Sequence, residues 1–465
     1  MVMQLNLPDI NNKINIRRKN ILASPKFGGS CDIDSIYYLN KLGVEIIESR
    51  QPIQFTPNFG EHVHRWAPYI QGFSSSFVQS VFDQYRKDYK SPVVLDPFAG
   101  CGTVLVQSKL NGHKSVGTEL NPLLQFIADT KANSWDVTPE LVSRLYTSIP
   151  KKIKTPAPDF LKSENQFDNR VLKNLELLKG GIDNISAKTK EQKQAQNLIL
   201  LAFSSILIDC SNLKRTPCLG YWKNKKVSDN APWMLMKTKI KEICNDLKIL
   251  QNKHKKNIKT ASKVCLANAM DYQHKEGFDL IITSPPYMNG LDYVMNYKIE
   301  MAWLGFTKEA KDAKKVKDNL VVCDNVSKGL IREFAQRYSK YTNEWLEEIK
   351  SNIRINIGRR GNYRRNDMPD IVHKYFDDMY KVMDKVSKSL NPNGRFILVV
   401  GDSLIADVYI PTDLLLARIG SELGLTIERI EKARNRYSGQ VRNYKLRETI
   451  ITLKKASRKR RDNGR

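Results

Sequence analysis

The most constraining feature of this sequence is a short apolar run that ends at two consecutive prolines. Residues 278–287 read Phe-Asp-Leu-Ile-Ile-Thr-Ser-Pro-Pro-Tyr. The apolar residues 280–282 are typical of a buried central strand of a parallel sheet. Pro285 and Pro286 donate no backbone hydrogen bond and fix φ, so the strand must end there. The sequence therefore predicts a strand whose carboxyl end, where α/β sheets bind ligands, presents a serine hydroxyl, carbonyls and an aromatic ring.

A second strand, turn and helix are predicted at residues 93–110. Residues 93–95 are apolar, and the turn after them reads Asp-Pro-Phe-Ala-Gly-Cys-Gly-Thr over residues 96–103. Gly100 and Gly102 allow the backbone to approach a ligand where a Cβ would collide. Their spacing differs from the G-x-G-x-x-G pattern of dinucleotide-binding proteins, so a nicotinamide site is not indicated.

An acidic residue ends the next predicted strand, residues 114–118. Glu119 stands at that end, and Asn121-Pro122 then begins a helix. An acidic side chain there can accept hydrogen bonds from both hydroxyls of a ribose. Glu119 alone is also compatible with a solvated carboxylate or a helix cap. Glu119 and the glycine turn together favour a cofactor that contains a ribose.

The charge of the chain favours a polyanionic partner. Lys and Arg number 76 against 49 Asp and Glu, which gives a formal net charge of +27. Such a surface is typical of a protein that binds nucleic acid. The alternative is a basic surface with no specific partner.

Several classes of protein are not indicated. The seven cysteines are scattered with no Cys-x-x-Cys pair, so neither a metal site nor a disulfide framework is predicted. Residues 1–20 lack the apolar core of a signal peptide, and the longest apolar stretch, 197–208, is too short to span a bilayer. We expect a cytoplasmic protein without membrane contact.

The two motifs together resemble those of the S-adenosylmethionine-dependent DNA amino-methyltransferases, which act on cytosine N4 or adenine N6. The catalytic motif of that family is Ser, Asp or Asn followed by Pro-Pro and an aromatic residue, and its cofactor loop is similar to residues 96–103. The resemblance covers residues 64–136 and 261–453, with the cofactor loop first, one of the family's permutations. It implies an α/β fold with a Rossmann-like methyltransferase sheet, mostly parallel with an antiparallel terminal strand, and helical insertions.

The resemblance also implies a set of residues that bind S-adenosylmethionine. Asp96 would lie near the methionine amino group, and a Phe-Ser segment before the first strand would close over that end. The family usually has Asp-Ala where this chain has Asn268-Ala269; an amide oxygen can replace the acid, or the contact shifts to Asp271. Trp66 and Tyr69, singly, are predicted to pack in the core. The implied set is Phe73, Ser74, Asp96, Pro97, Phe98, Gly100, Gly102, Thr103, Glu119, Asn268 and Ala269.

The catalytic residues implied by the resemblance are Ser284, Pro285, Pro286 and Tyr287. An exocyclic amine is a poor nucleophile because its lone pair is delocalised into the ring. We expect Ser284 and the Pro285 carbonyl to accept its two hydrogens, and Tyr287 to stack on a base that has left the duplex. Such a step needs mainly positioning and exclusion of water.

The first residue of the motif bears on the substrate. Serine before Pro-Pro-Tyr is typical of cytosine-N4 enzymes, so we predict a site-specific cytosine-N4 DNA methyltransferase of a restriction-modification system. An adenine-N6 enzyme and an RNA or tRNA base methyltransferase are the alternatives. A carbon-5 cytosine enzyme would need a cysteine after proline at a strand end, and Pro217-Cys218 lies elsewhere. A catalytically silent DNA-binding protein is disfavoured because both motifs are intact.

The expected macromolecular partner is double-stranded DNA. A cognate restriction endonuclease would act on the same site without stable contact. Two arginine-rich stretches, 354–365 and 434–440, are predicted to be loops that contact phosphates or base edges, with a solvated basic loop as the alternative. The candidate DNA-binding residues are Arg359, Arg360, Arg364, Arg365, Arg434 and Arg436.

The predicted division of the chain has six parts. They are an N-terminal region 1–90 with a cofactor-closing segment near 64–76, a cofactor-binding half 91–136, a helical insertion 137–260, a catalytic half 261–287 with 371–453, a target-recognition region 288–370, and a basic tail 454–465. Within the catalytic half we expect helices over 371–390 and 412–423, a strand over 396–400, and an antiparallel end pair, 426–430 and 448–453.

Overall fold

The structure is a computed structural model of the chain. It describes residues 29–49, 51, 53–69, 72–161, 163–215, 218–289, 292–323, 325–338, 341–361, 363–438 and 443–457. Within these ranges no helix combines the length and the apolar character that a bilayer crossing requires. The first 28 residues and most of the predicted basic tail lie outside them, as do Pro217 and the end of the stretch 434–440.

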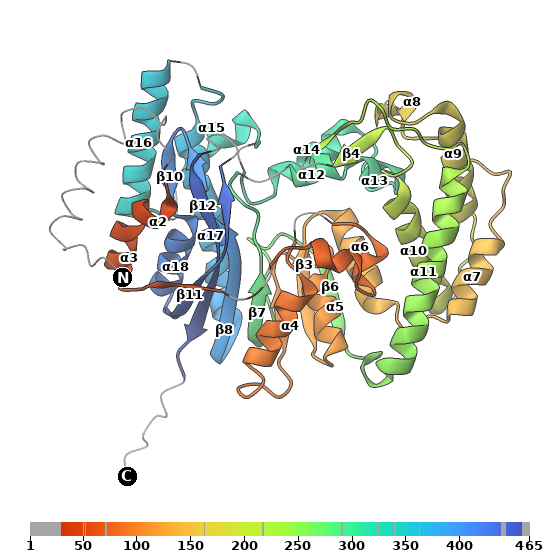
Figure 1. Ribbon diagram of the computed structural model, residues 1–465, viewed down its shortest axis with the longest axis horizontal. Helices are drawn as coiled ribbons and strands as arrows, with labels where there is room; N and C mark the ends of the chain where they lie inside the picture. The colour runs from red at the N-terminus through yellow and green to blue at the C-terminus, as the bar shows by residue number, and fades with distance from the viewer. Residues whose placement is uncertain are drawn as a thin grey trace, which may run out of the picture.

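An eight-stranded sheet forms the centre of the molecule (Figure 1). Its strands in spatial order are β1 (Ile46–Glu48), β11 (Leu425–Tyr437), β12 (Lys445–Lys455), β8 (Leu390–Gly401), β7 (Phe278–Thr283), β2 (Val94–Asp96), β3 (Ser115–Glu119) and β6 (Ser262–Leu266). All neighbours pair in parallel except β12, which is antiparallel to both β11 and β8. The predicted class, an α/β Rossmann-like methyltransferase sheet with an antiparallel strand near one end, is confirmed.

Strand β7 is buried on both faces, as its continuous apolar sequence predicted. Leu280 and Ile282 pack with α4 (Ser75–Gln84) on one face of the sheet. Ile281 points to the other face, where α17 (Met368–Ser389) and α18 (Thr412–Glu422) cover the sheet. Successive side chains of a strand alternate between faces, so the apolar residues 280–282 meet a packed core on both sides of the sheet.

The order of the strands reverses between β2 and β7. From β2 the chain runs through α5 (Thr103–Leu110), β3 and α6 (Pro122–Asn133), and later reaches β6, all on one side of β2. It then crosses to the other side, where β7 and β8 lie. In open α/β sheets the ligand binds at the carboxyl ends of the strands that flank such a reversal.

The predicted insertion is helical and packs against α6 (right side of Figure 1). Leu123, Leu124 and Ile127 of α6 share one apolar core with the insertion. Its elements are α7 (Pro139–Thr147), η3 (Asp159–Leu161), α8 (Ser163–Gln166), α9 (Asn169–Asp183), α10 (Lys190–Ile206), the hairpin β4 (Leu213–Arg215) and β5 (Leu219–Tyr221), α11 (Ala231–Lys253) and η4 (Lys255–Asn257).

The remaining elements precede β2 or follow β7 in the chain. They are α2 (Cys31–Asp34), α3 (Ile36–Leu42), η1 (Thr56–Phe59), η2 (His64–Trp66), α12 (Tyr293–Asn296), α13 (Lys298–Trp303), α14 (Ala310–Asp318), α15 (Lys328–Gln336), α16 (Glu344–Arg360), β9 (Ser403–Ile405) and β10 (Val408–Ile410).

Several predictions about the edges and loops were wrong. The end pair 426–430 and 448–453 exists as β11 and β12, but β11 is not the edge because β1 pairs with it. Residues 354–360 belong to helix α16, where Trp345, Ile349 and Ile353 form a buried stripe. Residues 434–437 extend strand β11, and Lys454 and Lys455 extend β12 where a tail was expected. In each case long-range pairing or packing outweighed a locally polar sequence.

Candidate active site

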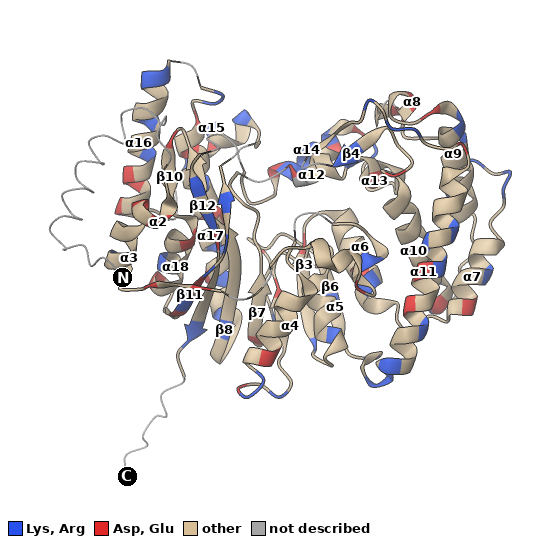
Figure 2. Cartoon of the chain, viewed as in Figure 1, with Lys and Arg blue, Asp and Glu red and all other residues tan. Residues whose placement is uncertain are grey.

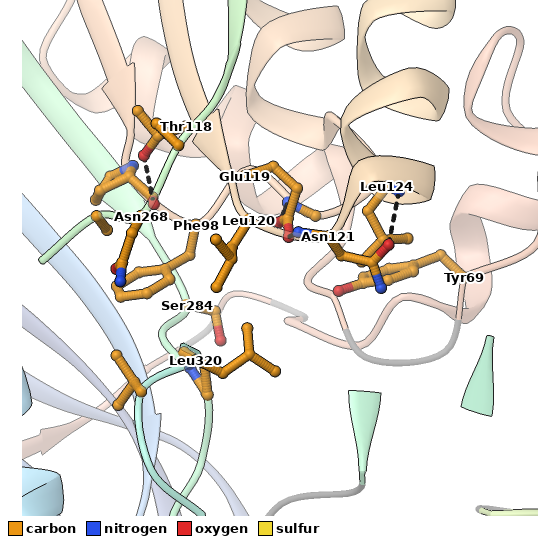
Figure 3. Close-up of a pocket in the computed structure, with 16 residues that line it drawn as sticks. Tyr69, Phe98, Thr118, Glu119, Leu120, Asn121, Leu124, Asn268, Ser284 and Leu320 are labelled. Carbon is orange, nitrogen blue, oxygen red and sulfur yellow. Dashed lines mark hydrogen bonds between the residues drawn. The ribbon is translucent and has the colours of Figure 1, made fainter. Parts of the chain in front are cut away.

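A pocket opens at the carboxyl ends of β2, β3, β6 and β7 (Figure 3). Its empty volume is about 590 Å³, including its open mouth. Because Gly100 and Ser284 both line it, the glycine turn and the first residue of the Ser-Pro-Pro-Tyr motif share one cavity. The lining residues are Tyr69, Pro97, Phe98, Gly100, Thr118, Glu119, Leu120, Asn121, Leu124, Ala267, Asn268, Ala269, Ser284, Pro286, Leu320 and Val321.

The glycine turn is held against the end of β3 by hydrogen bonds. Ala99 N donates to the Thr118 carbonyl at 2.9 Å, and Thr118 Oγ1 donates to the Pro97 carbonyl at 2.7 Å (Figure 3). Gly100 has φ +50°, and a Cβ there would lie 2.8 Å from Tyr69 Oη. Gly102 has φ +86°, and its Cβ would lie 3.0 Å from the Ala128 backbone. Both positions therefore require glycine.

Glu119 is a buried carboxylate at the centre of the pocket wall. Its Oε2 accepts from Gly100 N at 2.9 Å, and its Oε1 accepts from Asn121 N at 2.8 Å. Burial raises the pKa of Glu119 to about 7, although these two hydrogen bonds favour the charged form. Each oxygen keeps a lone pair, so Glu119 can still accept from two hydroxyls.

Asp96 lies beneath the pocket and is not among its lining residues. Its Oδ1 accepts from Thr283 Oγ1 at 2.7 Å and from Phe98 N at 3.0 Å. Burial raises the pKa of Asp96 to about 7. Asp96 thus ties the end of β2 to the end of β7, and its contact with a cofactor stays a prediction.

Four other candidate cofactor residues are also absent from the pocket lining. Phe73 packs edge-to-face on Phe77, and Ser74 Oγ caps α4 by accepting from Phe77 N at 3.1 Å. Gly102 and Thr103 form the start of α5. Their roles toward a cofactor also stay predictions.

Asn268 lines the pocket with its amide already engaged. Its Oδ1 accepts from Met270 N at 3.0 Å, and its Nδ2 donates to the Asn319 carbonyl at 3.1 Å. The oxygen has a second lone pair for a donor in the pocket. Asp271, the alternative acceptor, is exposed and does not line the pocket.

Tyr69 is a pocket residue that the sequence interpretation assigned to core packing. Its ring lies parallel to that of Tyr297, with centroids 6.0 Å apart and an interplanar angle of 17°. Nothing in the aromatic-rich sequence around residue 69 distinguishes one ring from another. Its place in the site depends on Tyr297, which is distant in sequence.

Tyr287 lies beside the pocket and is held at both its hydroxyl and its ring. The hydroxyl donates to Glu448 Oε1, and the guanidinium of Arg436 lies 5.6 Å from the ring centroid. Burial, followed by the charge of Glu448, raises the pKa of Tyr287 well above its ordinary value, so the phenol remains a donor. Tyr375 Oη donates to the Pro286 carbonyl at 3.0 Å. Sequence reasoning did not identify Glu448 or Tyr375.

The candidate DNA-binding arginines differ in exposure and in their contacts within the protein. Arg434 pairs with Glu448, and Arg436 donates to the Asp402 carbonyl. Arg365 pairs with Asp367 at 2.6 Å, and Arg360 pairs with Asp407. Arg359 and Arg364 are exposed. Because Arg434 and Arg436 lie in strand β11 next to Tyr287, the loop predicted for them was wrong, and DNA contact by all six stays a prediction.

Comparison with known proteins finds similarity over nearly the whole chain, although no family model matches. The chain is 24% identical over 472 residues to the type II methyltransferase M.BsoBI of Geobacillus stearothermophilus, covering 90% of this chain and 91% of that protein. It is 24% identical over 423 residues to the type II methyltransferase M.AvaI of Nostoc sp., covering 82% and 83%. It is 21% identical over 415 residues to the type II methyltransferase M.MvaI of Kocuria varians, covering 82% and 86%.

One solved structure, the rRNA methyltransferase aviRa from Streptomyces viridochromogenes, is similar at 8% identity with a TM-score of 0.29, covering 83% of this chain and 87% of that one. The sequence similarities extend far beyond the two motifs, because the aligned part covers 82–90% of the chain.

Proposed function

This chain belongs to the type II DNA methyltransferases of restriction-modification systems. From that premise we propose that it methylates the N4 amino group of cytosine in duplex DNA, with S-adenosylmethionine as the methyl donor. The observation that carries the proposal is the shared pocket: the glycine turn and Glu119 form one wall, and Ser284 lies in the same cavity. Serine as the first motif residue supports cytosine N4 over adenine N6.

The residues of the pocket fit this cofactor. Glu119 offers two acceptor oxygens for vicinal hydroxyls, and Gly100 lines the pocket beside Tyr69, which fills the space that a Cβ would need. Phe98, Leu120 and Ala269 provide apolar surface for an adenine ring, and Asn268 provides an amide. S-adenosylmethionine would supply an electrophilic methyl group on its sulfonium.

The residues of the motif would prepare the cytosine amine for attack. Ser284 Oγ and the Pro285 carbonyl would accept the amino hydrogens and localise the lone pair on nitrogen. The two prolines fix the turn, and the bond from Tyr375 to the Pro286 carbonyl adds a further restraint. The nitrogen would gain the methyl group as the bond from that carbon to the sulfonium sulfur breaks, with the electron pair staying on sulfur, and it would lose one proton to water. Positioning and exclusion of water supply most of the acceleration.

Mass spectrometry of nucleosides tests the proposed product. Plasmid DNA incubated with the enzyme and S-adenosylmethionine is expected to yield N4-methyldeoxycytidine, and the Ser284→Ala variant is the control that should yield about 100- to 1000-fold less in the same time. N6-methyldeoxyadenosine would overturn the choice of base. Methylation of tRNA without methylation of DNA would overturn the choice of substrate.

Cofactor affinity is expected to depend on the charge of Glu119. Since the pKa of Glu119 in the free protein is about 7, lowering the pH from 8 to 6 protonates most of it, and the Kd for S-adenosylmethionine should rise about tenfold. Binding near pH 7 should release protons, measurable by calorimetry in buffers of different ionisation enthalpy. Glu119→Gln should bind weakly with little pH dependence. If the Kd of Glu119→Gln changed with pH as much as the wild-type Kd does, a different group would be responsible for the pH dependence. Asp96 is the next group with a pKa near 7.

The raised pKa of Glu119 affects the stability of the folded protein in the opposite direction to cofactor affinity: stability is higher at low pH. A carboxyl whose folded pKa is raised contributes fully below its unfolded pKa of about 4.5, and this contribution is lost as pH rises through 7. The free protein should therefore lose stability from this group between about pH 4.5 and 7. Saturating S-adenosylmethionine should remove part of that loss.

A further inference from the structure

The hairpin β4–β5 is a two-stranded ribbon that pairs with no other strand in the described part of the chain. It lies within the insertion. Tyr221 at its end and Trp222 just after it are 60% and 50% exposed. Two large aromatic side chains exposed at consecutive positions are uncommon on a protein surface without a partner. The end of the ribbon therefore presents two aromatic rings that the fold itself leaves exposed.

The surface around these rings is basic. Residues 213–226 contain five Lys and Arg and no Asp or Glu. Lys214, Lys223 and Lys226 are exposed, and Lys214 Nζ lies 5.6 Å from the centroid of the Trp222 ring. Figure 2 shows Lys and Arg at β4 and at the neighbouring α14. Positive charge interleaved with aromatic rings complements a nucleic acid.

The ribbon is anchored next to the active site by buried contacts. Arg215 Nε donates to the Asn296 carbonyl at 2.8 Å, and Leu219 N donates to Asn296 Oδ1 at 2.8 Å. The Arg215 guanidinium pairs with Glu300 and lies 4.7 Å from the centroid of the Tyr297 ring.

This anchor is continuous with the pocket. Tyr297 stacks on Tyr69, which lines the pocket together with Ser284. Asn296 ends α12, the first helix after the Ser-Pro-Pro-Tyr motif. Both strands of the ribbon are therefore bonded to the segment that leaves the catalytic turn.

We propose that the ribbon surface, defined by Lys214, Tyr221, Trp222, Lys223 and Lys226, binds the DNA duplex beside the target base. This inference rests on the proposed function. A two-stranded β-ribbon fits the major groove, where lysines reach phosphates and aromatic rings reach bases or sugars. Helices α12 and α13, which contact the ribbon through Asn296 and Glu300, belong to the region 288–370 that we predicted for target recognition.

The salt dependence of DNA binding tests the lysines. With the full-length protein and a labelled mixed-sequence duplex, the slope of log K against log salt should fall by about 0.9 in Lys214→Ala, and by about 2 to 3 in the triple variant Lys214→Ala/Lys223→Ala/Lys226→Ala. Lys253→Ala is the matched control, because Lys253 is exposed at the far end of the 23-residue α11, about 30 Å along the helix axis. An unchanged slope in the triple variant would overturn the proposal.

The aromatic rings are tested by the double variant Tyr221→Ala/Trp222→Ala. Its kcat/KM for DNA should fall about tenfold or more, with unchanged Kd for S-adenosylmethionine and an unchanged melting temperature. Loss of self-association in sedimentation with intact DNA affinity would instead make the ribbon an interface between copies of this chain. Selective loss of RNA binding would also overturn the proposal.

The binding test does not depend on catalysis, so it separates the two proposals. If the wild-type protein formed no methylated nucleoside, the proposed function would fail while the salt slopes were still measurable. If the wild-type protein methylated DNA and all ribbon variants did so equally well, only the ribbon proposal would fail.

Discussion

Replacing Ser284 by alanine is expected to lower kcat for methyl transfer by about 100- to 1000-fold, with a Kd for S-adenosylmethionine within about twofold of wild type. The hydroxyl would act on the amine only as charge develops on nitrogen, so its loss should raise the barrier and leave ground-state binding of the donor intact. The turn keeps its shape in the variant because Pro285 and Pro286 fix it, and Tyr375 still bonds the Pro286 carbonyl. Single-turnover kinetics with saturating DNA and calorimetry with the donor measure the two quantities.

Tyr287 provides the companion test of this assignment. Tyr287→Ala removes the ring expected to stack on the base and should also abolish transfer with donor binding intact. Tyr287→Phe keeps the ring but loses the hydroxyl's bond to Glu448, so it should retain a measurable part of the activity. Wild-type rates in Ser284→Ala or Tyr287→Ala would show that the motif does not act on the amine.

Glu448 is expected to act through Tyr287 as a positioning residue. Its buried carboxylate receives the Tyr287 hydroxyl and pairs with Arg434 on the neighbouring strand. Glu448→Ala should lower kcat more than it changes KM, and Glu448→Gln should restore most of the loss because an amide oxygen still accepts the hydroxyl. Equal losses in both variants would indicate that the charge, and not the position of the ring, matters.

Replacing Asp246 by alanine is expected to destabilise the folded protein by about 3–5 kcal/mol. Asp246 lies in α11 with a fully buried side chain, and its two oxygens receive donors from the segment 62–66. The donors are His62 Nδ1 at 2.8 Å, Val63 N at 3.1 Å, Arg65 Nε at 3.1 Å and Trp66 Nε1 at 2.9 Å. The alanine variant would leave these groups, several of them buried, without an acceptor, at the full cost of their desolvation.

Loss of the Asp246 hydrogen bonds should affect the active site as well as the stability of the fold. The segment that Asp246 holds ends three residues before Tyr69, which lines the pocket. Urea unfolding measures the stability, and donor binding should weaken in parallel. Asp229→Ala is the control, because Asp229 pairs with Arg170 at a surface where both side chains are at least half exposed, and its loss should cost less than about 1 kcal/mol. A similar small loss in Asp246→Ala would contradict the assigned role.

The contribution of Asp246 has a defined pH dependence. Burial alone would raise the pKa of its carboxyl, but hydrogen bonds from Arg65, Val63 and His62 outweigh burial and lower the pKa. A lowered folded pKa means that the stabilisation is present above the unfolded value, about 3.9, and is lost as pH falls through the folded pKa. The difference between wild type and Asp246→Ala should therefore shrink in acid.

The parts of the molecule that followed from local sequence are those with strong local determinants. Pro285 and Pro286 end β7 whatever surrounds them, and Gly100 and Gly102 occupy backbone conformations that other residues avoid. Asn121 caps α6 within its own turn, accepting from Leu123 N at 3.0 Å. Each of these constraints acts over a few residues, so the pattern of the sequence was enough to locate the strand ends and the turn that form the pocket.

Where local sequence was ambiguous, packing decided. The arginine-rich residues 354–360 lack the composition of a buried element, yet they continue α16 because Ile349 and Ile353 pack beside α17. Arg434 and Arg436 extend β11 because β12 supplies partners for them, Arg434 opposite Glu448 and Arg436 opposite Leu446. A loop prediction based on charge alone could not include those partners.

The sequence by itself located the strand ends and the two motifs at the carboxyl edge of the sheet, and the resemblance of those motifs implied the class of the sheet. Only the tertiary structure decided which further side chains complete the site. Glu448 meets Tyr287 across 161 residues, and Asp246 meets Trp66 across 180. The physical reason is range: turns, caps and apolar periodicity act between near neighbours in the chain, whereas a buried carboxylate finds its donors only after distant segments have packed together.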